Sequence, residues 1–297
     1  MRDRPLNLIV GIATAGRRTI LSATIELLAR QTRLPDRLVI CPTSPNDVDS
    51  AAIDRFPAPV LIVNGATGLP AQRNHILSKC SEADVIVFFD DDFFPAPNYL
   101  SEIERLFHEK PDVVGATGFL LADGINGPGI SAEDGLRILS ELKEAPVERS
   151  FELYGAYGCN MSFRLAPVRQ HCLQFDENLP LYGWQEDVDF SRQLAAHGRI
   201  VKSDRMQGVH LGTKRGRTSG VRLGYSQVAN PIYLTSKGTF AGSRAVRRII
   251  KNVVANAFRS LKPEPWVDRR GRLKGNLIAI GDIAAGRLSP RRILELD

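Results

Sequence analysis

The first two thirds of the chain alternate short apolar runs with segments in which apolar residues recur at helical spacing. Such alternation predicts an α/β domain whose parallel strands are connected by helices. The run Asp84–Asp90 is β-branched and aromatic throughout, which predicts a central strand buried on both faces. The expected strands and helices are, in order, Leu6–Ala13, Arg17–Gln31, Arg37–Cys41, Pro59–Asn64, Pro70–Cys80, Asp84–Asp90, Tyr99–Glu109, Val113–Leu121, Gly158–Arg164 and Gln185–Gly198.

The C-terminal segment differs from the rest of the chain in charge. From Ala241 onward it holds 13 Lys and Arg against 5 Asp and Glu, whereas the preceding 240 residues hold 26 against 28. Small residues between Gly238 and Gly242 mark the change. We therefore expect a catalytic domain over residues 1–240 and a basic, mainly helical extension over residues 241–297.

The stretch Ser243–Phe258 predicts a basic amphipathic helix. A helix of this kind suits an anionic membrane surface, and packing of its apolar side on the catalytic domain is an equally good interpretation. Nucleic acid is not an expected partner, because no aromatic residues alternate with the basic ones. At helical spacing, one side carries Arg244, Arg247, Arg248 and Lys251 and the other carries Val246, Ile249, Ile250, Val253 and Ala257.

Hydropathy and cysteine content predict a cytoplasmic location. No apolar run approaches the roughly 20 residues that cross a bilayer. The apolar run at the N-terminus is short and contains Asn7, which argues against a secretion signal. The four cysteines are scattered without a C-x-x-C pair, as expected of buried thiols in a reducing compartment. Peripheral attachment to the inner face of the cytoplasmic membrane is compatible with this location.

Three carboxylates, Asp90, Asp91 and Asp92, directly follow the predicted central strand. Strand alternation directs Asp90 and Asp92 to one side and Asp91 to the other, so Asp91 is expected to matter least. Two carboxylates about 5 Å apart repel by roughly 3 kcal/mol at an effective dielectric constant near 20. A divalent cation bound with substrate phosphates offsets this repulsion. A solvated acidic turn is the structural alternative.

A second acidic pair, Glu186 and Asp187, opens a predicted helix next to the aromatic residues Tyr182 and Trp184. A carboxylate beside a flat apolar surface suits a sugar site, where it accepts a proton from a hydroxyl. The alternative is that both acids simply favour the helix N-terminus. Further along, Lys214, Arg215 and Arg217 predict a cationic loop that closes over a diphosphate.

Six segments in this order resemble the family 2 glycosyltransferases, which are inverting sugar transferases with the GT-A fold. The resemblance runs from Leu6 to about Gly212 and implies a mixed, mostly parallel sheet flanked by helices. It also implies a nucleotide-sugar donor and a divalent metal, Mn²⁺ or Mg²⁺. The segments that carry it are "IATAGR", "GLPAQRN", "VIVFFDDDFFPAPNYL", "GCNMSFR", "GWQEDVDFSRQLAAHG" and "GVHLG".

The resemblance assigns roles to individual positions. Asp187 matches the catalytic base, Asp92 the metal-binding acid of a D-x-D motif, and His210 a position that ligates the metal in some relatives. Many members carry an acid pair after the second strand that contacts uracil; this chain has Pro42, Thr43 and Ser44 there, with Asp47 as a substitute. The residues expected to contact substrate are Thr14, Arg17, Thr43, Arg73, Asp90, Asp91, Trp184, Glu186, Lys214 and Arg217.

The expected reaction is an in-line displacement at the anomeric carbon, with Asp187 taking the proton of the acceptor hydroxyl. The donor is a nucleotide-diphosphate sugar, with uridine favoured and thymidine or guanosine as alternatives. The acceptor is a saccharide or a lipid-linked molecule of bacterial polysaccharide or cell-envelope glycan synthesis. A non-catalytic nucleotide-sugar scaffold and a metal-dependent phosphatase that uses the D-x-D strand end remain alternatives. Phosphatases of that type normally continue with Thr or Val, where this chain has Phe93.

Overall fold

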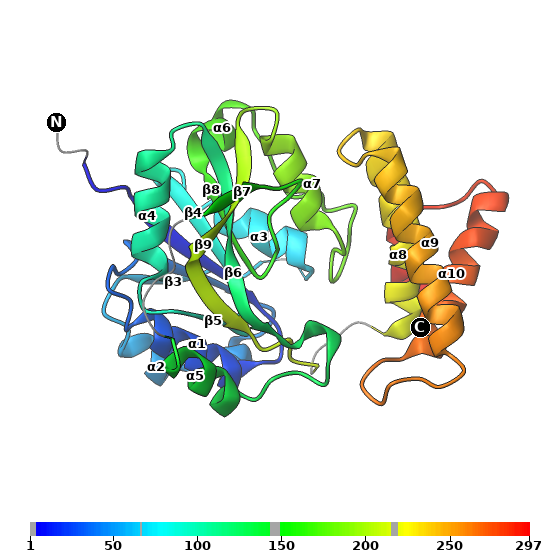
Figure 1. Ribbon diagram of the computed structural model, residues 1–297, viewed down its shortest axis with the longest axis horizontal. Coiled ribbons are helices and arrows are strands. Elements are labelled where there is room, and N and C mark those ends of the chain that lie inside the picture. The colour runs from blue at the N-terminus through cyan, green and yellow to red at the C-terminus, as the bar shows by residue number, and fades with distance from the viewer. Residues whose placement is uncertain (1–3, 66, 143–148, 215–218) are drawn as a thin grey trace.

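The computed structural model describes residues 4–65, 67–142, 149–214 and 219–297, and its strands form one mixed sheet (Figure 1). Along the sheet the strands lie in the order β3, β2, β1, β4, β8, β6, β9 and β5, and β7 pairs with β9. The strands are β1 (Leu8–Thr14), β2 (Arg37–Pro42), β3 (Val60–Ile62), β4 (Val85–Asp90), β5 (Phe93–Pro95), β6 (Val113–Asp123), β7 (Ser150–Glu152), β8 (Asn160–Arg164) and β9 (Arg199–His210).

The predicted α/β organisation is confirmed, and β4 occupies the expected central position. It pairs in parallel with β1 and antiparallel with β8, and its residues Val85 to Phe89 are buried. Parallel pairings also join β1 with β2, β2 with β3, and β6 with β9. The β-branched and aromatic composition of β4 therefore reflects a strand covered on both faces.

Helices cover both faces of the sheet because its strands are apolar on both sides. On one face, Leu8, Val10 and Ile12 of β1 share a core with residues of α1 and α4. On the other, Ile9 shares a core with residues of α3, α6 and α7. The helices of this part are α1 (Arg18–Leu28), α2 (Ser50–Asp54), α3 (Leu69–Leu77), α4 (Tyr99–Glu109), α5 (Ala132–Ser140), α6 (Leu165–Gln170) and α7 (Glu186–Leu194), with short 3₁₀ turns η1 (Pro45–Asp47) and η2 (Gly124–Asn126).

Strand β9 was not among the sequence predictions, because charged and polar residues interrupt its apolar positions. It pairs in parallel with β6 and antiparallel with β5. In these pairings His210 lies opposite both Phe93 of β5 and Asp123 of β6. A residue distant in sequence is thereby brought to the end of β4.

The described chain after β9 is mainly helical. Its elements are α8 (Gly220–Lys237), α9 (Gly242–Arg259), α10 (Arg269–Ala284) and the 3₁₀ segment η3 (Pro290–Glu295). Helix α8 packs against α9, α10 and η3, and Figure 1 shows these helices side by side at one end of the molecule. We call α8, α9, α10 and η3 the helical unit. Within the described residues, no helix combines the length and hydropathy needed to cross a membrane.

Helices α8 and α10 approach closely at two glycines. A Cβ atom on Gly224 would lie 2.0 Å from the carbonyl oxygen of Arg272, and one on Gly275 would lie 2.0 Å from that of Val221. Both contacts are with backbone atoms, which cannot rotate away. The helix pair therefore depends on the absence of side chains at these positions.

We predict that Gly224→Ala lowers the free energy of unfolding by about 1–3 kcal/mol, the usual cost of overpacking a core. Gly281→Ala in α10 is the matched control, because a Cβ there meets no atom within 4 Å. Alanine at that helical position is expected to be neutral or stabilising by up to about 1 kcal/mol. Urea denaturation of both variants measures the difference, and equal stabilities would contradict this packing account.

Candidate active site

Polar side chains gather where the carboxyl ends of β1, β4, β6 and β9 meet. Thr14 ends β1, Asp90 ends β4, Asp123 ends β6 and His210 ends β9. Because β1 and β4 are parallel, and so are β6 and β9, these ends lie along one edge of the sheet. Ligands of open α/β sheets bind at such an edge.

Asp90, Asp92 and His210 form a group suited to a divalent cation. One ligand atom from each of the three residues lies within 4.8 Å of the others. His210 Nδ1 lies 2.8 Å from Asp123 Oδ1, and Nε2 lies 3.5 Å from Asp92 Oδ1. A carboxylate that orients the outer nitrogen of a metal-binding imidazole is a common feature of metal sites. Two carboxylates and one imidazole suit Mn²⁺, and Mg²⁺ accepts the carboxylates.

The charged side chains of this group shift one another's pKa values. Burial acts to lower the pKa of His210, but hydrogen bonds to Asp123 and Asp92 outweigh it and raise the pKa to about 10. Burial acts to raise the pKa of Asp92, but the hydrogen bond with His210 and the nearby Arg17 bring it below its usual value. Burial raises the pKa of Asp90 against the opposing effect of Arg73. In this structure, cationic side chains offset the repulsion expected between the acids.

Asp91 is not part of this group, and it makes more contacts than expected. The predicted strand alternation does not apply to it, because β4 ends at Asp90 and residues 91 and 92 form a turn. Its Oδ2 accepts a hydrogen bond of 2.7 Å from Thr14, and its Oδ1 accepts one of 2.8 Å from Arg17. The carbonyl oxygen of Asp91 accepts a further bond from Thr24 in α1. Asp91 therefore fixes the end of β1 and the start of α1 beside the carboxylates.

A cavity of about 270 Å³ lies between the loops that follow β1 and β2, and Arg17 and Asp47 line it. Asp47 is buried; its Oδ1 accepts a hydrogen bond from the backbone N–H of Gly16, and its Oδ2 accepts one from Thr43. Both carboxylate oxygens thus hold the two loops together. Thr43 is exposed.

Arg73, on α3, connects the two acidic clusters and is 2% exposed. Its Nη2 donates to Asp90 Oδ1 at 3.0 Å and to the carbonyl oxygen of Gly158 at 2.8 Å, while Nη1 pairs with Glu186. Burial, partly offset by Arg73, raises the pKa of Glu186 to about 8. Arg73 and Glu186 are thus positioned to hold the two clusters together.

Asp187 lies at the first turn of α7, next to Glu186. Its Oδ2 accepts a hydrogen bond from the backbone N–H of Gly158 at 3.0 Å, and its Oδ1 accepts one from that of Val188 at 2.8 Å. Burial raises its pKa, although these two backbone N–H groups and Arg73 oppose the shift. The side chain faces a cavity and makes no ion pair among the described residues, unlike Glu186.

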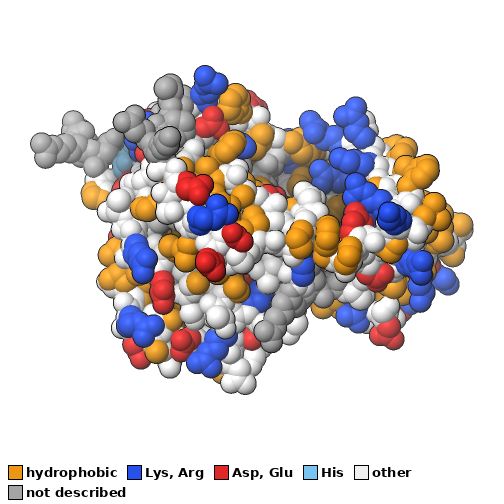
Figure 2. All heavy atoms as spheres, turned by 60° about the horizontal axis from the view of Figure 1, so that its bottom comes forward, with side chains coloured by type: hydrophobic (Ala, Val, Ile, Leu, Met, Phe, Trp, Pro, Cys, Tyr) orange, Lys and Arg blue, Asp and Glu red, His pale blue; other side chains and the backbone are white. Residues whose placement is uncertain are grey.

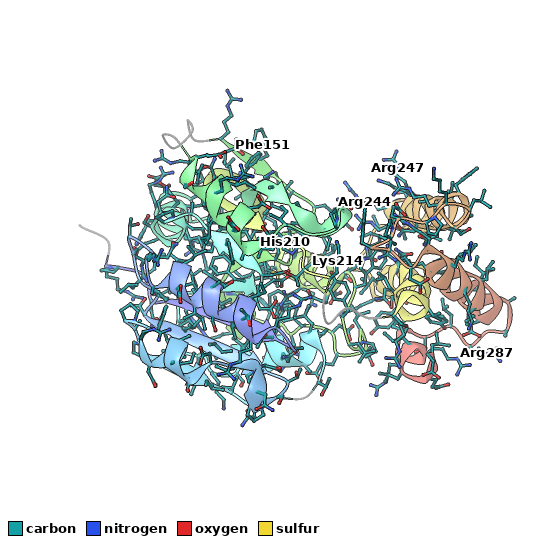
Figure 3. The ribbon with its side chains drawn as sticks, turned by 90° about the horizontal axis from the view of Figure 1, so that it is seen from below. Phe151, His210, Lys214, Arg244, Arg247 and Arg287 are labelled. Atoms are coloured by element: carbon teal, nitrogen blue, oxygen red, sulfur yellow. The ribbon has the colours of Figure 1, made fainter. Side chains whose placement is uncertain are left out.

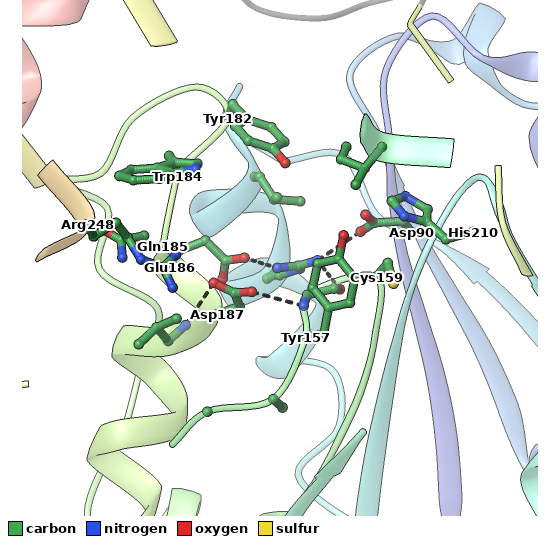
Figure 4. A pocket seen from close by; sticks show the side chains of 18 residues that line it. Asp90, Tyr157, Cys159, Tyr182, Trp184, Gln185, Glu186, Asp187, His210 and Arg248 are labelled. Atoms are coloured by element: carbon green, nitrogen blue, oxygen red, sulfur yellow. Dashed lines mark hydrogen bonds and ion pairs between the residues drawn. The ribbon is translucent and has the colours of Figure 1, made fainter. Parts of the chain in front are cut away.

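This cavity has a volume of about 420 Å³ and brings both clusters together (Figure 4). Trp184 and Arg248 lie on one side of Asp187, and Asp90 and His210 lie on the other. Gln185 also lines the cavity; it is buried and adopts a left-handed backbone conformation with φ of 74°. Among the described residues, neither polar atom of its side chain has a hydrogen-bond partner. Both polar atoms are buried, so this amide lies in the cavity wall.

The structure places Lys214 differently from the sequence interpretation. Lys214 donates hydrogen bonds of 3.0 and 2.9 Å to the carbonyl oxygens of Gly124 and Ile125, so its ammonium group holds the η2 turn. Arg217, and Arg215 beside it, lie outside the described residues. The predicted cationic loop is therefore represented here by Lys214 alone.

Four cavity or metal-group residues were missed by sequence reasoning. Asp123 could have been predicted, because it ends an apolar strand as Asp90 does. Tyr157 donates to Asp123 Oδ2 at 3.1 Å and its ring meets that of His210 edge-on. Gln185 and Arg248 gave no signal, since their place in the cavity depends on a left-handed turn and on how the helical unit packs.

Comparison with solved structures identifies the fold. The mannosyltransferase PcManGT from Pyrobaculum calidifontis, in complex with GDP-Man and Mn²⁺, aligns with a TM-score of 0.56 and 13% identity, covering 97% of this chain and 88% of that one. S. aureus TarS 1-349 in complex with UDP aligns with a TM-score of 0.55 and 14% identity, covering 98% and 90%. This chain covers only 46% of the longer TarS chain, with a TM-score of 0.50, 15% identity and 88% of this chain aligned.

These neighbours are glycosyltransferases of the GT-A fold, and the mixed α/β sheet with its flanking helices has that fold. No curated protein matches the sequence. The family model described as "Glycosyl transferase family 2" matches residues 9–169, more than half of the chain. The chain therefore belongs to glycosyl transferase family 2.

Proposed function

We propose that the protein transfers a sugar, with inversion, from a nucleotide-diphosphate sugar to an acceptor hydroxyl in a metal-dependent reaction. The observation that carries this proposal is the cavity lined by Asp187 together with Asp90 and His210, two members of the Asp90, Asp92 and His210 group. A sugar between them has a carboxylate on one side and a cation-binding group on the other. Inversion requires this arrangement, because the acceptor oxygen attacks opposite the leaving diphosphate.

The donor is expected to occupy the edge formed by β1, β4 and β9. Asp90, Asp92 and, once it has lost its proton, His210 would hold a divalent metal, Mn²⁺ or Mg²⁺. Such a metal would supply positive charge opposite the donor's diphosphate. The 270 Å³ cavity lined by Arg17 and Asp47 accommodates the nucleoside, and Thr43 borders it through its hydrogen bond to Asp47. Solved neighbours contain UDP-GlcNAc, UDP or GDP-Man, which supports a nucleotide-sugar donor. Thr14 supports this site indirectly by bonding to Asp91.

Asp187 acts as the general base. The backbone N–H groups of Gly158 and Val188 fix the orientation of its carboxylate. Burial raises its pKa toward the operating pH, which increases its strength as a base. As the acceptor oxygen forms its bond to the anomeric carbon, its proton passes to a carboxylate oxygen of Asp187, and the nucleoside diphosphate departs.

The acceptor enters from the side of Trp184. The Trp184 ring lines the cavity and offers a flat apolar surface to a sugar. We infer a saccharide or lipid-linked acceptor in bacterial polysaccharide or cell-envelope glycan synthesis. The enzyme would act in the cytoplasm, and a lipid-linked acceptor would bring it to the inner face of the cytoplasmic membrane.

We predict that Asp187→Asn lowers the rate of transfer from UDP- or GDP-sugars by about 10²–10⁴-fold, the usual contribution of a general base. The rate is measured as release of nucleoside diphosphate, with water as the acceptor. Binding of UDP or GDP with Mn²⁺ should remain unchanged, which shows that the variant is folded. Near-normal turnover would exclude Asp187 as the base.

The proposed metal group has its own test. Mn²⁺ binding, followed by electron paramagnetic resonance, should be lost in Asp92→Asn and weakened by about 10–100-fold in Asp123→Asn, which removes only the partner of His210. Asp134→Asn on the exposed surface of α5 is the control and should bind Mn²⁺ normally. Equal Mn²⁺ affinity in all three variants would rule out this site.

The raised pKa of Asp187 predicts a particular pH dependence. The base works only when ionised, so turnover should fall as the pH drops through the pKa of Asp187. Because burial raises that pKa, the midpoint should lie above about 4, the value of an exposed aspartate. A kcat profile that stays flat down to pH of about 4 would show that no such base titrates.

A further inference from the structure

Helix α9 exposes a line of apolar side chains that no described part of the chain covers. Its residues recur at every fourth position along three turns and continue beyond the helix end, so they lie on one side of the helix. The exposed fractions are 58% for Val246, 57% for Ile250, 46% for Val254, 73% for Phe258 and 83% for Leu261. We call these five residues the apolar ridge.

The ridge is distinct from the side by which α9 packs. Ala245 and Asn256 are buried, and Ile249 and Val253 pack against the core formed with α8 and α10. The sequence interpretation grouped Ile249 and Val253 with Val246 and Ile250 on one apolar side. The structure divides that side into a packed strip and an exposed ridge, so packing within the protein does not account for all of it.

Helix α10 extends the exposed apolar surface. It packs against α9, and Figure 1 shows the two helices side by side. Leu277, Ile280 and Ile283 of α10 are each more than two fifths exposed. Figure 2 shows hydrophobic side chains gathered on the helical unit with Lys and Arg side chains next to them. Large apolar surface of this kind marks a binding face.

Charge indicates what covers this face. Arg247 and Lys251 each follow a ridge residue directly, and Lys274 lies on α10; none of the three has an ion-pair partner among the described residues. The nearby acids are already paired, Glu264 with Arg259 and Arg269, and Asp282 with Arg287. The surface thus carries uncompensated positive charge beside apolar side chains, which complements an anionic lipid surface.

The same helix borders the active-site cavity. Arg248, one residue after Arg247, lines that cavity, and its guanidinium lies 6.0 Å from the centre of the Trp184 ring. Arg244, one turn earlier, lies 4.3 Å from the ring centre of Tyr154 in the catalytic part. Figure 3 shows Arg244 and Arg247 projecting from α9. Contact between the ridge and a bilayer would therefore hold the acceptor side of the cavity close to the lipid headgroups.

We propose that the apolar ridge, with Arg247, Lys251 and Lys274, docks the protein on an anionic membrane surface. The ridge side chains enter the boundary between headgroups and acyl chains, and the cations contact the acidic headgroups. This inference deepens the proposed function, because it places the cavity at the surface where a lipid-linked acceptor resides. The docking itself requires no catalysis.

The test is co-sedimentation of the full chain with phosphatidylcholine vesicles, with and without phosphatidylglycerol. We expect binding to the anionic vesicles that weakens as salt rises. Arg247→Glu and Lys251→Glu should each lower the partition coefficient by at least about fivefold, since each lipid-facing cation contributes about 1 kcal/mol. Ile250→Glu with Phe258→Glu should abolish binding. Phe151→Glu, which changes a 51% exposed aromatic residue on β7, is the matched control and should bind normally.

Two results would overturn the proposal. One is absence of binding to anionic vesicles at low salt; the other is an equal loss in the Phe151→Glu control. If sedimentation equilibrium instead shows dimers that Phe258→Glu dissociates, and vesicles are not bound, the ridge contacts a second copy of the chain. Hydrolysis of UDP- or GDP-sugars without vesicles is measured on the same samples, so loss of docking is distinguished from failure of the proposed enzymatic function.

Discussion

The active site depends on the two ion pairs that the buried guanidinium of Arg73 makes. Three acidic residues, Asp90, Glu186 and Asp187, line one cavity, and Asp92 lies close to Asp90. Burial alone would favour the neutral forms of these acids. Arg73 pairs with one acid from each cluster, Asp90 and Glu186. It thereby compensates part of their charge and fixes the distance between α7 and the end of β4. Removal of such a partner leaves uncompensated buried charge, which commonly costs several kcal/mol.

The acids differ in how they are held. Glu186 and Asp90 pair with Arg73, and Asp91 pairs with Arg17. Asp187 is held only by backbone N–H groups, so its carboxylate can change protonation without breaking an ion pair. Asp90 and Asp92 converge with His210 because β9 pairs between β6 and β5. The groups that contact each acid therefore give neighbouring acids different chemical properties.

Much of the fold was predictable from local pattern, and the site was predictable only in part. Strand β4 and helix α4 could be predicted from the sequence. The buried positions of β4 form a continuous apolar run, and those of α4 recur at helical spacing. The strand alternation predicted for Asp90, Asp91 and Asp92 does not apply, because β4 ends at Asp90 and the next two residues form a turn. The places of Asp123 and Arg248 in the site could not be predicted, because they depend on the pairing of β6 with β9 and on the docking of α9.

The account's central claim is that one acidic cluster binds the donor's metal while Asp187, across the same cavity, faces the sugar. A crystal structure with Mn²⁺ and UDP or GDP, with the metal located from its anomalous scattering, tests this most directly. The account predicts a single peak bounded by Asp90, Asp92 and His210 and touching the diphosphate, with Asp187 free of metal. A peak coordinated by Glu186 or Asp187 would contradict it.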